Sequence, residues 1–144
     1  MRLAKAHILI VSGLILISTL LGGCTSTEQN QTLGTKAEIV KEVSPQEAEN
    51  LINNDDNLTV IDVRTPQEYA TGHLPQSINL DLRSQTFNEE LGKLDKNKAY
   101  LVYCQSGNRS QKALDTMKEL GFKEVYNLSG GITQWGVNSL PIVK

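Results

Sequence analysis

The sequence lacks the features that mark several large classes of protein. It has no run of basic residues and no patch of interleaved basic and aromatic residues, which excludes a surface for DNA or RNA. It has no internal repeat, and its longest apolar run, residues 8–21, is shorter than the roughly 20 residues that span a bilayer comfortably. It has only two cysteines, so if Cys24 is modified then Cys104 has no partner for an internal disulfide.

The first 23 residues have the pattern of a secretion signal, because Arg2 and Lys5 precede the apolar run. The run ends in Leu21-Gly22-Gly23-Cys24, which resembles a bacterial lipobox, where the cysteine receives a diacylglyceryl group and becomes the new N-terminus. We therefore expect Cys24 to carry lipid and the protein to be a membrane-anchored, extracytoplasmic lipoprotein of the cell envelope. The alternatives are a permanent membrane helix and an ordinary signal peptide that is cleaved near Cys24.

The rest of the chain divides into a tether and one domain. Residues 24–38 are rich in Thr, Gln and Glu and contain no aromatic residue, which is typical of a flexible tether. Residues 39–144 suffice for one globular domain and no second core. Without the signal, the chain has 12 basic and 16 acidic residues, a mild acidic excess that again disfavours nucleic acid.

Within residues 39–144, apolar strand-like runs alternate with helical patterns, which predicts an α/β fold. Two capping boxes with proline at the first helical position, Ser44-Pro45-Gln46-Glu47 and Thr65-Pro66-Gln67-Glu68, mark helix starts. A further helix is expected from Ser110, ending near Gly121. Strands are expected at residues 39–43, 58–63, 79–82, 99–103 and 125–128.

The stretch CQSGNRS, residues 104–110, follows the strand predicted at 99–103 and therefore lies at a strand-to-helix turn. Amides of such a loop and the free N-terminus of the next helix favour an anion, so Cys104 is expected to ionise readily. Gly107 lets the loop curl tightly, and Arg109 adds a permanent positive charge. The alternative is a small buried core cysteine, but the polar neighbours Gln105, Ser106, Asn108 and Arg109 argue against it.

Four separated segments together resemble the rhodanese domain, in the same order and with similar spacing over about 100 residues. They are Ile61-Asp62-Val63-Arg64 with Glu68-Tyr69; Gly72-His73-Leu74-Pro75 with Ile78-Asn79; Cys104 to Ser110; and Gly130-Gly131-Ile132 with Trp135. The resemblance implies a single-domain sulfurtransferase with a three-layer fold, in which a central, mostly parallel sheet is flanked by helices. It also implies that Cys104 accepts a sulfane sulfur as a persulfide and passes it to cyanide or a thiol.

The resemblance assigns roles to further residues. The amides of Gln105, Ser106, Gly107, Asn108, Arg109 and Ser110 are expected to bind the substrate and hold the persulfide anion, and Arg109 either binds the donor's sulfonate or braces the loop. Asp62 and Arg64 either orient the loop or pair with each other. His73 and Trp135 are interpreted as structural. We expect a monomer that needs no metal and no cofactor, with a small sulfur donor and a thiol or cyanide acceptor as its partners.

Two other functions remain open from the sequence. Related phosphatases and arsenate reductases have a loop one residue longer, which encircles a tetrahedral oxoanion, whereas only four residues separate Cys104 from Arg109 here. The shorter loop favours sulfur transfer over phosphate hydrolysis. The second alternative is a membrane-tethered persulfide carrier or redox-sensing module that uses Cys104 without turnover.

Overall fold

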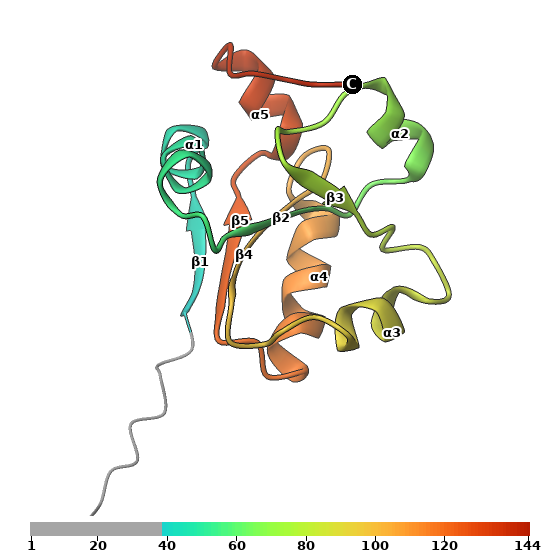
Figure 1. The fold of residues 1–144 in the computed structure, drawn as a ribbon. Coiled ribbons are helices and arrows are strands. Elements are labelled where there is room, and N and C mark those ends of the chain that lie inside the picture. The colour runs from blue at the N-terminus through green and yellow to red at the C-terminus, as the bar shows by residue number, and fades with distance from the viewer. Residues whose placement is uncertain (1–38) are drawn as a thin grey trace, which may run out of the picture. The chain divides into compact units, whose positions relative to one another are not determined.

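The computed structural model describes residues 39–144, which form five strands and five helices in alternation (Figure 1). The elements are β1 (Ile39–Val43), α1 (Pro45–Asn54), β2 (Thr59–Asp62), α2 (Pro66–Thr71), β3 (Ser77–Asn79), α3 (Phe87–Gly92), β4 (Ala99–Tyr103), α4 (Asn108–Glu119), β5 (Glu124–Leu128) and α5 (Gly131–Val137). The predicted signal, the tether and Cys24 lie outside the described residues. Of the helices formed by residues 39–144, none combines the length and apolar character needed to cross a bilayer.

The five strands form one parallel sheet in the order β1-β5-β4-β2-β3. The predicted α/β class is therefore confirmed, because the strands are parallel and a helix lies between each strand and the next along the chain. β4 lies at the centre, and all five of its residues are buried. Its side chains alternate between the two faces, so that Val102 packs into one apolar cluster and Leu101 into another.

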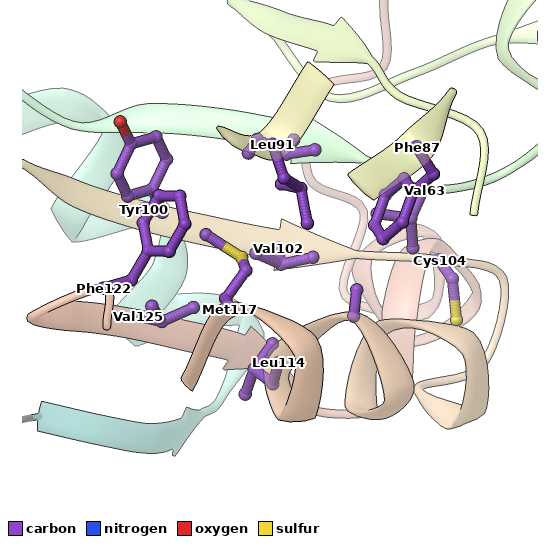
Figure 2. Packing of buried hydrophobic residues seen from close by; sticks show 12 residues of the cluster. Val63, Phe87, Leu91, Tyr100, Val102, Cys104, Leu114, Met117, Phe122 and Val125 are labelled. Carbon is purple, nitrogen blue, oxygen red and sulfur yellow. The ribbon is translucent and has the colours of Figure 1, made fainter. Parts of the chain in front are cut away.

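The two clusters make the fold three-layered. On one face, α3 and α4 cover the sheet through Phe87, Leu91, Leu114 and Met117 (Figure 2). The other cluster takes residues from α1 and α5, with Trp135 fully buried in it. At about 25 cal/mol per Å² of apolar surface, these two clusters supply the main driving force for folding.

Both predicted capping boxes are present. The hydroxyl of Ser44 accepts a hydrogen bond from the amide of Glu47 at 3.3 Å, and the Glu47 carboxylate accepts one from the Ser44 amide at 2.9 Å. Thr65 and Glu68 make the same reciprocal pair at the start of α2. The helix expected to end near Gly121 does so, and Gly121 has a left-handed conformation with a φ of 82°.

Two predicted elements begin two residues earlier than expected. The third strand is Ser77–Asn79 instead of residues 79–82, because Gln76 turns the chain with a φ of 61° and brings Ser77 into register with Val60. Helix α4 begins at Asn108 instead of Ser110. Its N-cap is Gly107, whose carbonyl already accepts the amide of Gln111 at 3.0 Å. The helix therefore starts inside the cysteine loop.

Candidate active site

Cys104 is the first residue after β4, and its side chain points toward the N-terminal end of α4 (Figure 2). The amide of Gly107 donates to the Cys104 Sγ at 3.2 Å, and the hydroxyl of Ser110 lies 3.6 Å from the same sulfur. The backbone amides of Ser106 and Ser110 also lower the pKa of Cys104. Polar groups from the loop and from the first turn of α4 therefore surround one sulfur atom.

Burial of the site is uneven. Cys104 is only 1% exposed and borders the apolar cluster that α3 and α4 cover. Its loop neighbours Gln105, Ser106 and Asn108 are exposed. The expectation that a polar run would not surround a buried residue was therefore wrong for Cys104 itself. The sulfur is as buried as a core residue, yet hydrogen-bond donors contact it.

The donors decide the ionisation of the thiol. Burial by itself raises the pKa of Cys104, because it removes water from the thiolate. Hydrogen bonds from the Ser110 hydroxyl and from the amides of Ser110, Ser106 and Gly107 outweigh this effect and bring the pKa below its ordinary value. The positive end of α4 acts in the same direction. The site thus favours the thiolate, which is the nucleophilic form of cysteine.

Gly107 gives the loop its shape. Its φ of 100° is a conformation that residues with a Cβ rarely adopt, and its amide is one of the donors to Cys104. The conformation also places the Gly107 carbonyl 3.0 Å from the Ser110 hydroxyl. The single hydroxyl hydrogen of Ser110 can be directed to this carbonyl or to the sulfur, and an ionised sulfur attracts it more strongly.

Arg109 is engaged in a bidentate ion pair with Glu68 on α2. Its Nη1 and Nη2 atoms lie 2.7 Å and 2.6 Å from the two carboxylate oxygens of Glu68. The same carboxylate caps α2 through Thr65. Of the two roles expected for Arg109, the geometry fits bracing the loop better than binding a sulfonate, because the guanidinium charge already has a partner.

Glu68 was not predicted to be a site residue. The Arg109 guanidinium lowers the pKa of Glu68 to about 2, and Glu68 in turn raises the pKa of Arg109. The pair therefore stays ionised throughout the physiological range. Glu68 occurs in the capping box and in the family segment, but it lies 41 positions from Arg109 in the sequence, so no local pattern links the two.

Asp62 and Arg64 pair with each other at the end of β2. The Asp62 Oδ2 and Arg64 Nη2 atoms are 2.6 Å apart, with side chains 0% and 4% exposed. Arg64 Nη2 also donates to the Gly72 carbonyl at 2.7 Å. Burial lowers the pKa of Arg64, but the bond to Asp62 more than compensates. The pair fixes the chain between β2 and the start of β3, which fits the pairing role of the two that were expected.

The first turn of α5 contacts the backbone of the cysteine loop. The amide of Ile132 donates to the Cys104 carbonyl at 2.9 Å. This approach requires Gly131, because a Cβ there would stand 2.4 Å from the same carbonyl oxygen. Gly131 thus permits the close contact between α5 and the Cys104 carbonyl.

His73 and Trp135 have structural contacts, as interpreted from the sequence. The His73 ring stacks on Tyr69 at 3.8 Å between centroids, and its Nδ1 atom lies 3.1 Å from the Tyr69 carbonyl oxygen. Trp135 is 1% exposed and donates from Nε1 to the Pro141 carbonyl at 2.8 Å. Both residues therefore stabilise the segments around the site.

Comparison with known proteins gives one family. A model described as the rhodanese-like domain matches residues 44–138. The putative sulfurtransferase YtwF of Bacillus subtilis is 36% identical over 71% of this chain and 96% of its own length. The thiosulfate sulfurtransferase GlpE of Ectopseudomonas mendocina is 37% identical over 66% of this chain and 84% of its own length. A tRNA uridine(34) hydroxylase of Buchnera aphidicola is 39% identical, but this chain spans only 33% of it.

Solved structures agree with the fold. A rhodanese-related protein from Thermoplasma volcanium superposes with a TM-score of 0.64 at 30% identity, covering 72% of this chain and 97% of that chain. A polysulfide-sulfur transferase from Wolinella succinogenes gives a TM-score of 0.61 at 30% identity, covering 72% and 78%.

The donor set around Cys104 leads to a prediction about its pH dependence. Thiolate content, and hence the alkylation rate by iodoacetamide, should rise with pH through a midpoint below the ordinary value of about 8.5. Ser110→Ala removes one donor and should shift that midpoint upward and slow alkylation at pH 7 by about two- to ten-fold, the usual value of one hydrogen bond. Tryptic peptide 99–109 reports Cys104 separately from Cys24.

Ser84→Ala is the control for this measurement, because the Ser84 hydroxyl bonds to Thr86 in the turn before α3. Its profile should match that of the unchanged protein. A midpoint at or above the ordinary value, or a Ser110→Ala profile identical to that of the unchanged protein, would contradict the role given to the donors.

Proposed function

The chain belongs to the rhodanese-like domain family, and from that membership we propose that it transfers a sulfane sulfur through a persulfide on Cys104. The observation that carries the proposal is the convergence of the Gly107 amide and the Ser110 hydroxyl on one buried sulfur. A persulfide is an anion at neutral pH, and preorganised amides stabilise such an anion without having to move. Relatives named as sulfurtransferases support the reaction class.

The first step loads sulfur onto the enzyme. The Cys104 thiolate attacks the outer sulfur of a donor such as thiosulfate, and a new S–S bond forms to Sγ. The bond between the outer and inner sulfur of the donor breaks, and sulfite leaves with its electron pair. The negative charge then resides on the terminal sulfur of the Cys104 persulfide, close to the positive end of α4.

The second step unloads the sulfur. A cyanide ion or a thiolate attacks the terminal sulfur and forms thiocyanate or the persulfide of the acceptor. The Sγ–S bond breaks, and its electron pair returns to Cys104 as thiolate. Atoms and electrons balance over the two steps, so the cycle requires no external oxidant or reductant.

Within this proposal Arg109 acts through the loop. Its pair with Glu68 joins the first turn of α4 to the first turn of α2, which holds the end of the loop where α4 begins. The sulfonate of the donor would then be bound mainly by the amides and the exposed polar side chains of Gln105, Ser106 and Asn108. Recognition by so few groups suits a small donor.

We also propose that the domain works on the exported side of a membrane. The support is the signal pattern of residues 1–23 and the lipobox-like sequence that ends at Cys24. Two acyl chains on Cys24 would hold the protein on the membrane, and residues 24–38 would separate it from the domain.

Sulfur loading is tested by the mass of the protein after incubation with thiosulfate. We expect a gain of one sulfur atom on Cys104, removed by cyanide with release of thiocyanate. Cys104→Ser should abolish both the gain and steady-state thiocyanate production. Retained turnover in that variant, or no sulfur on the unchanged protein, would contradict the proposal.

Two further outcomes separate the alternatives. One equivalent of thiocyanate without steady-state turnover would indicate a carrier or sensor instead of an enzyme. Hydrolysis of an aryl phosphate would indicate the phosphatase alternative, and we expect none.

The anchor is tested by expressing the full chain in a bacterium with an alkyne-labelled fatty acid. We expect the label on the protein and the protein in the membrane fraction. Cys24→Ser should remove the label and release the domain or leave it unprocessed. An unlabelled protein in the membrane fraction would favour a permanent membrane helix, and an unlabelled protein outside it would favour an ordinary signal peptide.

A further inference from the structure

Thr133, on the first turn of α5, contacts the cysteine loop through both its backbone and its side chain. Its amide donates to the Gln105 carbonyl at 3.1 Å, and its Oγ1 hydroxyl donates to the same carbonyl at 2.8 Å. The side chain of Gln105 returns the contact, because Nε2 donates to Thr133 Oγ1 at 2.9 Å. The Thr133 hydroxyl therefore donates its one hydrogen to Gln105 and also accepts a hydrogen bond from Gln105.

These contacts fix the orientation of one peptide group. The carbonyl of Gln105 and the amide of Ser106 belong to the same planar trans unit, so they point in opposite directions. With the carbonyl held by α5, the Ser106 amide points away from α5, and this amide is one of the groups that lower the pKa of Cys104. A reversed peptide would instead bring a carbonyl oxygen toward a sulfur anion.

Core packing does not supply this orientation. Gln105 and Ser106 are both exposed, and the loop continues into Gly107, a residue with wide conformational freedom. The neighbouring peptide is held differently, since the Cys104 carbonyl accepts the amide of Ile132. The Gln105–Ser106 peptide is instead held in its orientation by the hydrogen bonds from the Thr133 amide and hydroxyl.

We propose that Thr133 is a positioning residue whose hydroxyl holds the Gln105–Ser106 peptide with its amide directed at the Cys104 sulfur. The consequence for persulfide lifetime rests on the proposed function, whereas the consequence for the thiolate does not. Thr133 does not touch the reacting sulfur. Its effect reaches Cys104 through the orientation of one amide group.

The experiment compares three variants of the full chain. Thr133→Val keeps the shape of the side chain and removes the hydroxyl, Thr133→Ser keeps the hydroxyl, and Thr116→Val is a matched control. Thr116 lies on α4, where its hydroxyl bonds to the Lys112 carbonyl at 3.3 Å. The readouts are the pH profile of Cys104 alkylation, followed on peptide 99–109, and the thermal midpoint of unfolding.

We expect Thr133→Val to move the alkylation profile to higher pH and to slow alkylation at pH 7 by about two- to ten-fold, the usual value of one hydrogen bond. Thr133→Ser and Thr116→Val should keep the original profile. Thr133 is exposed, so the thermal midpoint should change little. An unchanged profile in Thr133→Val, or an equal shift in Thr133→Ser, would overturn the proposal.

Sulfur loading is then measured on the same variants. If the unchanged protein accepts sulfur, its persulfide should decay more slowly than that of Thr133→Val, and an equal decay would overturn the extension to the persulfide. If the unchanged protein accepts no sulfur, the proposed function fails. The alkylation profiles then still decide whether Thr133 positions the peptide.

Discussion

The site depends on the stabilisation of a sulfur anion by hydrogen-bond donors in a place that water hardly reaches. Cys104 is 1% exposed, and an isolated buried charge costs several kcal/mol. Hydrogen bonds to a charged group each contribute about 1.5–3 kcal/mol, so the few donors around this sulfur are enough to offset that cost. The lowered pKa of Cys104 is the net result. Without those donors, the same position would hold an inert core cysteine.

The fold brings these donors together from elements that are distant in sequence. β4 is the central strand of the parallel sheet, and the loop at its carboxyl end leads into the N-terminal end of α4. From one side, Glu68 on α2 holds Arg109 at the start of α4. From the other side, α5 holds the loop carbonyls through the amides of Ile132 and Thr133. The loop is thus fixed by its neighbours, while the side chains of Ser106 and Asn108 are exposed to solvent, where a substrate would approach.

Much of this arrangement could be predicted from the sequence because the signals are local. The capping boxes at Ser44 and Thr65, the buried run of β4 and the loop after Cys104 each occupy a few consecutive residues. Boundaries were less accurate, since β3 is placed by its register with β2 and α4 begins at a glycine cap. The contact of Glu68 with Arg109 and that of Thr133 with Gln105 could not be predicted. They join residues 41 and 28 positions apart, and only the packed fold brings them together.

The central claim is tested most directly by following the amide protons of Ser106, Gly107 and Ser110 by NMR as the pH is raised. Their resonances should shift together, with one midpoint below the ordinary cysteine value of about 8.5, and the shift should be absent in Cys104→Ser. Amide resonances that do not shift as Cys104 ionises, or that shift with a midpoint at or above that value, would contradict this stabilisation.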